Sequence, residues 1–259
     1  MRTLLSFILL WSCTLLQAQD NWQQYRDRLP GWPADLTLSS VEAYTTALLT
    51  LRDELDQQLE SKGDQQETAL EGMTTAQAMQ MAARYQEHMM EKSPEEISAM
   101  IEQVNTDQSD LLVSIQLGQD LESAMQRFRD EYSAAVGGIR QQYPCEMGIR
   151  DASDRCEERS AALKELGIRL QTEHFSGEQA GVRIAVEAMR EHIYTKTLPS
   201  ALRKEQEQYT ALGVAPPAAS NTGLEMVKSD IGLLLGCAEL MGWVAGIRSN
   251  DNLFFTTGM

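Results

Sequence analysis

The segment that most constrains the fold runs from Ile231 to Ile247 and reads IGLLLGCAELMGWVAGI, with Glu239 as its only charge. A helix of this length spans about 26 Å, whereas the hydrocarbon core of a bilayer is about 30 Å thick. A charge at its midpoint would also be costly in lipid. We therefore predict a bundle helix buried on most of its circumference, and no transmembrane span in the mature protein.

The same segment holds several features that bear on function. Gly232-x-x-x-Gly236 and Gly242-x-x-x-Gly246 have the small-residue spacing that lets helices approach closely, in water or in lipid. Glu239 is predicted to be a buried acid and is the first candidate for a polar functional site. The lesser alternatives for the whole segment are a membrane span and a sheltered hairpin that inserts on a trigger.

The N-terminus has the form of a secretory signal peptide. Arg2 is the only early charge, residues 4–16 are largely apolar, and polar residues follow Ala18. We predict cleavage after Ala18, so that residues 1–18 are removed and the protein is periplasmic or extracellular. The alternative is a lipid anchor at Cys13.

Charge and cysteine usage narrow the class of protein. A net charge of −16 repels nucleic-acid phosphates and anionic lipid, so we expect neither as a partner, whereas a protein or peptide partner is compatible. Cys145 and Cys156 flank a predicted turn between helices, and we predict that they form a disulfide in an oxidising compartment. Cys237 is predicted to be a small buried hydrophobe, although pairings that include it stay open.

The predicted fold is all-α, because apolar residues recur in steps of three and four and no strand alternation is present. We predict an elongated antiparallel bundle of about six helices over residues 39–249. Residues 19–38 are predicted to be an irregular aromatic segment that closes one end of the bundle, the alternative being a ligand-binding lip. Residues 250–259 form a tail of no clear type.

The longest predicted helix covers 94–143. Its near-heptad spacing predicts coiled-coil-like packing, through which the chain could form an oligomer. Unbroken, it would span about 75 Å, so we expect either an elongated molecule with a kink, or a break at 105–107 or 137–138. Pro144 ends this helix, and a second helix returns over 153–174.

Other helix ends are predicted from capping and breaking residues. Gly63 is predicted to end the first helix, and Pro199 to kink or interrupt a later one. The predicted N-caps are Ser39 or Ser40, Thr74, Ser93 before Pro94, Ser176, and Thr222.

No catalytic or cofactor motif is found. A di-iron bundle needs Glu-x-x-His, but Tyr85, Gln171 and Met189 stand three positions before His88, His174 and His192. Phosphate-loop, Gly-x-Ser-x-Gly and Cys-x-x-Cys motifs are also absent. Glu187, Glu191 and His192 could form an acid/base group, although a solvated helix face is the favoured interpretation. We predict no cofactor and no catalytic residue.

Methionines are concentrated between Met73 and Met100, with His88 among them. Thioethers and an imidazole could hold Cu(I), with His88, Met89 and Met81 as the candidate ligands. The favoured interpretation is core packing, because methionine fills irregular cores and these side chains lie on different helix faces.

Residues 73–77, Met-Thr-Thr-Ala-Gln, resemble the Leu-Thr-x-x-Gln motif of small helical periplasmic chaperones. Methionine replaces leucine here, and the motif occurs once where those proteins usually carry it twice. They also present a positive cradle, whereas this chain is acidic. The resemblance implies a holdase-like chaperone as an alternative function.

The function predicted from the sequence is an exported, non-enzymatic binding or scaffold protein of the cell envelope. A holdase-like chaperone, a copper-binding protein and an enzyme of unrecognised type are the alternatives. A pocket with converging carboxylates or histidines would favour an enzyme, and an apolar groove would favour a binding protein.

Overall fold

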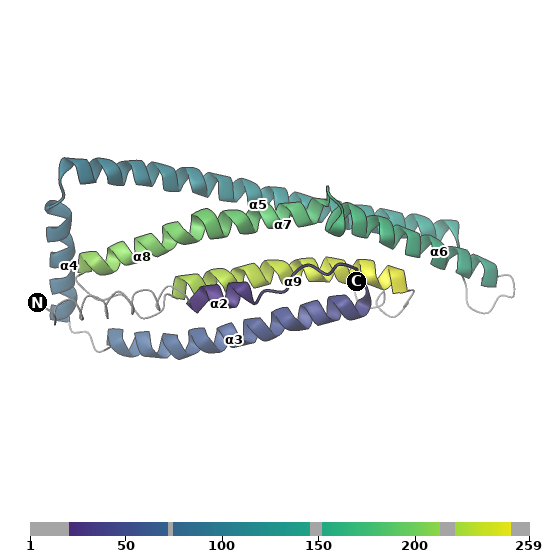
Figure 1. Cartoon of the computed structure of the whole chain (residues 1–259), viewed down its shortest axis with the longest axis horizontal. Helices are drawn as coiled ribbons and strands as arrows, with labels where there is room; N and C mark the ends of the chain where they lie inside the picture. Colours follow the sequence, from purple (N-terminus) through teal and green to yellow (C-terminus); the bar gives the residue numbers. More distant parts are fainter. Residues whose placement is uncertain (1–20, 72–74, 146–151, 213–220, 250–259) are drawn as a thin grey trace, which may run out of the picture. The chain divides into compact units, whose positions relative to one another are not determined.

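The computed structural model describes residues 21–71, 75–145, 152–212 and 221–249, and every regular element within these ranges is a helix (Figure 1). This confirms the predicted all-α fold. The helices are α2 (Asn21–Asp27), α3 (Leu38–Glu71), α4 (Thr75–Met90), α5 (Pro94–Gln142), α6 (Ala152–Gln171), the π-turn η1 (Thr172–Ser176), α7 (Gly181–His192), the π-turn η2 (Ile193–Thr197), α8 (Leu198–Leu212) and α9 (Asn221–Ser249).

Contacts between residues divide the chain into two compact units. Unit 1 combines Met1–Leu29, Thr50–Ile115 and Glu191–Ile231. Unit 2 combines Pro30–Leu49, Gln116–Arg190 and Gly232–Met259. The long helices α3, α5 and α9 each contribute one part to each unit. The predicted signal peptide at 1–18, the alternative anchor at Cys13, the cap at Thr74 and the tail at 250–259 lie outside the described residues.

Helix α9 contains the apolar segment and is buried on most of its circumference, as predicted. In unit 1 its inward side chains include Leu224, Val227 and Ile231, each 0% exposed. In unit 2 they include Leu234 and Met241, also 0% exposed. Among the described helices, α9 alone is long and apolar enough to cross a membrane, and 61% of its most apolar window is buried within the fold.

The core of unit 2 is centred on Phe128, a fully buried residue of α5. The rings of His174 and Phe175 meet it edge-on, with centroids 5.1 and 5.3 Å away, and Trp243 of α9 lies at 6.3 Å. His174 and Phe175 are both in η1, where the wider π-turn buries them. A local irregularity in the helix therefore supplies two of the aromatic contacts of this core.

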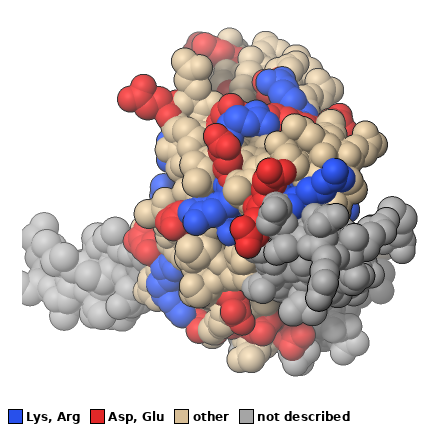
Figure 2. Space-filling model, turned by 90° about the vertical axis from the view of Figure 1, so that its right-hand side faces the viewer, with Lys and Arg blue, Asp and Glu red and all other residues tan. Residues whose placement is uncertain are grey.

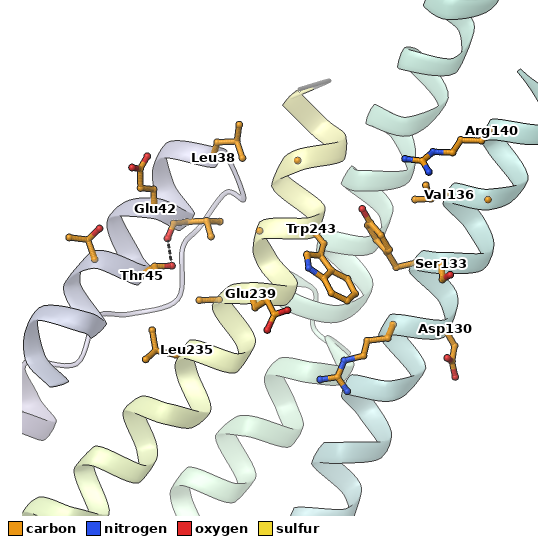
Figure 3. Close-up of a pocket in the computed structure, with 18 residues that line it drawn as sticks. Leu38, Glu42, Thr45, Asp130, Ser133, Val136, Arg140, Leu235, Glu239 and Trp243 are labelled. Atoms are coloured by element: carbon orange, nitrogen blue, oxygen red, sulfur yellow. Dashed lines mark hydrogen bonds between the residues drawn. The ribbon is translucent and has the colours of Figure 1, made fainter. Parts of the chain in front are cut away.

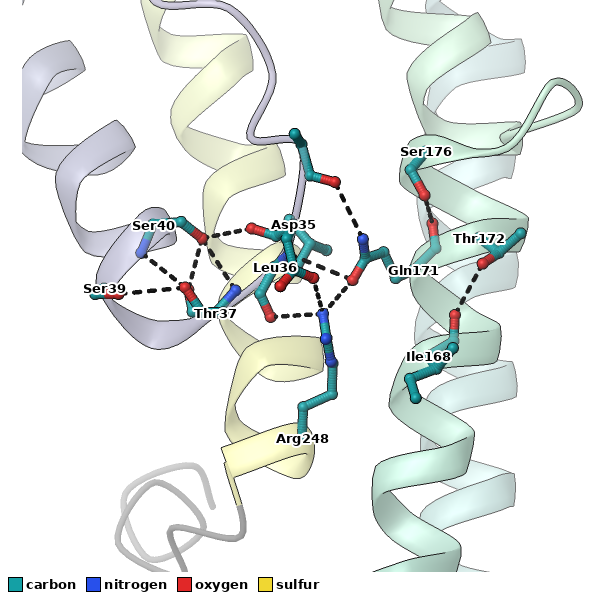
Figure 4. A network of polar contacts seen from close by, with 11 residues as sticks. Asp35, Leu36, Thr37, Ser39, Ser40, Ile168, Gln171, Thr172, Ser176 and Arg248 are labelled. Atoms are coloured by element: carbon teal, nitrogen blue, oxygen red, sulfur yellow. Dashed lines mark hydrogen bonds and ion pairs between the residues drawn. The ribbon is translucent and has the colours of Figure 1, made fainter.

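A polar clasp joins three segments of unit 2 (Figure 4). The Arg248 guanidinium of α9 binds the Asp35 carboxylate, the Leu36 carbonyl and the Gln171 amide oxygen of α6. Gln171 in turn accepts from the Leu36 N–H at 3.3 Å and donates to the Ala34 carbonyl at 3.4 Å. The Arg248 contact also holds the pKa of Asp35 below its usual value.

In unit 1, an aromatic contact involves the N-terminal part of the chain. The segment predicted to be irregular contains the short helix α2, and its Trp22 stacks on Tyr194 with centroids 6.0 Å apart and planes at 10°. The Arg26 guanidinium lies 4.5 Å from the centre of the same Tyr194 ring. The Tyr194 hydroxyl donates to the carboxylate of Asp230 at 2.8 Å, and Asp230 is 0% exposed.

The structure corrects several predicted helix ends. Helix α3 continues through Gly63 to Glu71, because one glycine costs a helix only about 1 kcal/mol and good helix formers follow it. Thr37 caps this helix, not Ser39 or Ser40: Thr37 Oγ1 accepts from the Ser40 N–H and Ser40 Oγ accepts from the Thr37 N–H. These two bonds form a capping box.

Two further predicted caps are wrong. Ser176 donates to the Gln171 carbonyl within η1, and the next helix begins later, at Gly181. Helix α9 already includes Asn221, so Thr222 lies within its first turn. In contrast, Ser93 caps α5 as predicted, with the Glu96 N–H bonded to Ser93 Oγ and the Ser93 N–H bonded to Glu96.

Helix α5 and the returning helix α6 confirm most features of the predicted hairpin. Helix α5 is continuous through 105–107 and 137–138, so the alternative of a break at these positions is wrong. A disulfide joins Cys145 to Cys156, with Cα atoms 5.1 Å apart, and Cys237 is buried. Further along the chain, Pro199 lies in the first turn of α8, and the α-helical pattern changes to the π-turn η2 just before that helix, near the predicted interruption.

Asp107 of α5 holds the polar contact between α5 and α8 in unit 1. Lys204 Nζ lies 2.9 Å from one carboxylate oxygen, while Ser200 and Arg203 bond the other at 2.8 and 3.1 Å. The Lys204 ammonium, reinforced by Ser200, Gln103 and Arg203, holds the pKa of Asp107 well below its usual range despite partial burial.

We expect Tyr194→Phe to lower the free energy of unfolding by about 1–3 kcal/mol, because it removes a donor from a buried carboxylate. Urea denaturation monitored by circular dichroism measures the change. A double-mutant cycle with Asp230→Asn is the control: the cost of Tyr194→Phe should shrink in that background. An equal cost in both backgrounds would contradict the assignment.

We expect Asp107→Asn to lower stability by about 1–3 kcal/mol near pH 7, since charge-assisted hydrogen bonds are lost. The folded-state pKa of Asp107 is depressed. The contribution of this carboxylate to stability is therefore complete above the unfolded-state pKa of about 3.9, and it is lost as pH falls from there through the folded-state pKa. The difference in free energy of unfolding between the parent chain and the variant should therefore be constant from pH 5 to 8 and shrink below about pH 4. Asp130→Asn, an exposed change on the same helix, should have little effect; a difference that persists unchanged at low pH would refute the prediction.

Candidate functional site

A groove lies in unit 2, formed by the unit 2 parts of α3, α5 and α9 (Figure 3). Its volume is about 1280 Å³. Each helix contributes residues spaced three or four apart, so each lines the groove with one face. The apolar lining residues are Leu38 and Val41 of α3, Tyr132 and Val136 of α5, and Leu235, Ala238 and Trp243 of α9.

Charged side chains of both signs surround this apolar lining. Glu42, Arg129, Asp130, Arg140 and Glu239 all contribute to the groove wall. Figure 3 shows that Glu42 and Asp130 point away from α9, whereas Glu239 points from α9 towards α5. The three carboxylates therefore diverge, and no histidine lines the groove, so the site lacks a convergent acid/base group.

Glu239 is exposed, which corrects its prediction as a buried acid. The fully buried acid of α9 is Asp230. Nine residues separate the two, which places them about 180° apart around a helix with 3.6 residues per turn. The prediction failed because the sequence did not show which face of α9 is left uncovered.

Two aromatic residues, whose ring planes are tilted by 46° to each other, form one wall of the groove. Trp243 of α9 lies with its ring centroid 5.3 Å from that of Tyr132 on α5. Burial raises the pKa of the Tyr132 phenol to about 12, and the nearby charge of Arg140 opposes this rise only in part. Tyr132 therefore stays neutral at physiological pH and acts here as an apolar surface with a hydroxyl group.

Gly242 and Gly246 of α9 line the groove and do not pack against another helix. A Cβ atom placed at Gly232, Gly242 or Gly246 would have no neighbour within 4 Å. At Gly236 it would meet only Met125 Cε, at 3.7 Å. The close helix approach predicted from the small-residue spacing is therefore wrong, and Gly242 and Gly246 line the groove.

A second polar cluster lies on unit 2 between α5, α6 and η1. Arg169 bonds Glu131 at 2.6 Å and Glu173 at 2.9 Å, and His174 Nε2 lies 2.9 Å from the other oxygen of Glu131. An ionised carboxylate only accepts, so His174 Nε2 donates. Burial alone would raise the pKa of Glu131, but the bonds from His174 and Arg169 hold it below its usual value.

The ligand atoms of Glu131, Glu173 and His174 lie within 4.8 Å of one another, a spacing that could hold a metal ion. Arg169, however, already places its positive charge against both carboxylates. The cluster therefore forms a compensated network that orients His174 against Phe128. No sequence pattern indicated this cluster, because it depends on the π-turn and on the pairing of α5 with α6.

The acid/base candidates predicted from the sequence do not line the groove. Glu187 is exposed and pairs with Arg183 at 3.6 Å, while His192 is buried with Nε2 3.0 Å from the Asp110 carbonyl, so no acid/base group forms. The side chains of Met81, His88 and Met89 lie outside the described part of α4, and the copper hypothesis stays a prediction. Met79 and Met90 on the same helix are exposed.

The face drawn in Figure 2 carries basic and acidic side chains interspersed, with no patch of a single sign. The groove likewise combines Arg129 and Arg140 with three acids. Comparison of the chain with protein-family models, with curated proteins and with solved structures found no match. The chemistry of the groove is therefore the basis for a functional assignment.

We expect Gly242→Ala to raise the free energy of unfolding by about 0.5–1 kcal/mol, because the new methyl meets open space and glycine is costly within a helix. Gly223→Ala on the same helix is the opposing variant. Its Cβ would lie 2.5 Å from Trp22 Cδ1, so we expect a loss of about 1–3 kcal/mol. Thermal and urea denaturation measure both; changes of the same sign would contradict the packing described.

Proposed function

We propose that this chain is an exported, non-enzymatic binding protein of the cell envelope, and that its groove holds an amphipathic helical segment of a partner protein. The observation that carries the proposal is the groove beside Trp243 and Glu239, with its apolar lining and charges of both signs. Protein interfaces commonly combine an apolar centre with a polar rim.

The dimensions of the groove favour a peptide segment over a small molecule. Small-molecule pockets typically enclose about 300–1,000 Å³, and this groove has a volume of about 1280 Å³. Its lining extends from Arg129 to Arg140 on α5 and from Leu235 to Gly246 on α9. Eleven residues of helix correspond to about 16 Å, or three turns. Helix-in-groove recognition uses apolar anchors over a similar length.

The charges favour a segment that carries basic residues beside its apolar face. Glu42, Asp130 and Glu239 outnumber Arg129 and Arg140 around the groove. The net charge of −16 for the whole chain would also attract a basic partner over longer distances. Export is supported by the signal-like residues 1–18 and by the Cys145–Cys156 disulfide, which suits an oxidising compartment.

A binding experiment with designed amphipathic helical peptides tests this function. The probes are a peptide with leucines on one face and lysines on the other, and a matched peptide with glutamates in place of the lysines. With Trp22 and Trp32 replaced by phenylalanine, Trp243 fluorescence reports on the groove of the mature chain. We expect the lysine peptide to bind with a micromolar dissociation constant and to shift the emission of Trp243.

Two leucine substitutions on α9 provide a matched pair. Gly242→Leu should fill the groove and weaken binding at least about tenfold, a change of about 1.4 kcal/mol. Gly232→Leu adds the same side chain at a position that is also open but does not line the groove, and it should bind like the parent chain. The proposal would be overturned if neither peptide binds, or if the two variants have equal effects on binding.

A further inference from the structure

The first part of α5, within unit 1, exposes a row of large apolar side chains. They recur in steps of three and four and share one helix face. Their exposed fractions range from 37% for Met100 to 68% for Leu112. We call this row the α5 apolar stripe: Ile97, Met100, Ile101, Val104, Leu111, Leu112 and Ile115.

The stripe is turned away from the contacts that α5 makes in unit 1. Asp107 bonds side chains of α8, and the Asp110 carbonyl accepts from His192. At 100° per residue, the face that holds these contacts lies about 110° around the helix from the centre of the stripe. A surface helix ordinarily directs its apolar face to the core, so this helix has an apolar face that its own fold leaves uncovered.

The stripe is also nearly free of charge, which is unusual in a chain with a net charge of −16. Between Ile97 and Ile115 the charged residues are Glu102, Asp107 and Asp110. Glu102 and Asp110 point to other sides of the helix, and Asp107 is compensated by Arg203 and Lys204. Two copies can therefore meet along the stripe without like charges facing each other.

Gln108 lies within the stripe, at the heptad position between Val104 and Leu111. A glutamine amide both donates and accepts, so it can pair with the same residue on a second copy. Single polar residues at such positions set the register of coiled coils. Seven side chains with this exposure offer on the order of 700 Å² per copy, near the roughly 800 Å² per partner of stable interfaces.

We propose that the α5 apolar stripe is the interface between two copies of this chain, which pair through a short coiled-coil-like contact of their α5 segments. This interface is independent of the proposed function, because the groove lies in unit 2 and the stripe in unit 1. Sedimentation velocity of the mature chain over a range of concentrations is the test. The parent chain should be a dimer at tens of micromolar.

Charged substitutions within the stripe should dissociate the dimer. The double variant Ile101→Glu, Ile115→Glu should raise the dissociation constant at least about tenfold. Val113→Glu adds the same charge at another exposed apolar position of α5, about 160° from Ile97 around the helix, and should stay dimeric. A parent chain that is monomeric throughout, or a double variant that is as dimeric as Val113→Glu, would overturn the proposal.

A mixing experiment separates a lost interface from a lost fold. Ile101→Lys, Ile115→Lys should also be monomeric, because the lysines repel across the interface. Mixing the lysine and glutamate variants should restore a dimer, since opposite charges then face each other whether the helices run parallel or antiparallel. Failure of the mixture to associate, with helical circular dichroism retained in both variants, would count against the proposal.

Discussion

Both units depend on the burial of α9. Its apolar segment contains only one charge. If only one face of this helix were covered, much of its apolar surface would stay in water. Burying apolar area contributes about 25 cal/mol per Å², which favours covering α9 from several directions. The chain meets this demand with segments that are distant in sequence, and α9 itself contributes Asn221–Ile231 to unit 1 and the rest to unit 2. The part that stays uncovered, around Glu239 and Gly242, borders the groove.

Apolar burial has no preferred direction, so polar contacts are needed to specify how each part of α9 sits among its neighbours. In unit 1 the Asp230–Tyr194 bond performs this role, and Trp22 packs over Tyr194. In unit 2 the Arg248 clasp ties the end of α9 to α6 and to the segment before α3 (Figure 4). A displaced helix would leave these polar groups without partners, at a cost of a few kcal/mol each.

The groove and the α5 apolar stripe are two different results of incomplete burial. In the groove, small residues of α9 leave space between helices, and Trp243 and Tyr132 remain as an ordered apolar wall. On the stripe, α5 directs polar residues to its own unit and apolar residues outward. Both features follow from which helix face is used for internal contacts. The two proposals rest on these features, with the groove as the surface for a partner segment and the stripe as the surface for a second copy.

Local features of the fold were predictable because they depend on residues that lie close together in the sequence. Three- and four-residue periodicity predicted the helices, Ser93 and Pro94 predicted the start of α5, and the close spacing of Cys145 and Cys156 predicted their pairing. The prediction that the first helix ends at Gly63 was wrong, because a single glycine only weakens a helix. Periodicity could not predict that Glu239 is exposed, that Asp230 is buried, or that the His174 side chain is buried in the core. An apolar helix such as α9 has no polar face to indicate its orientation, so contacts with distant segments select which side is buried and where a groove remains.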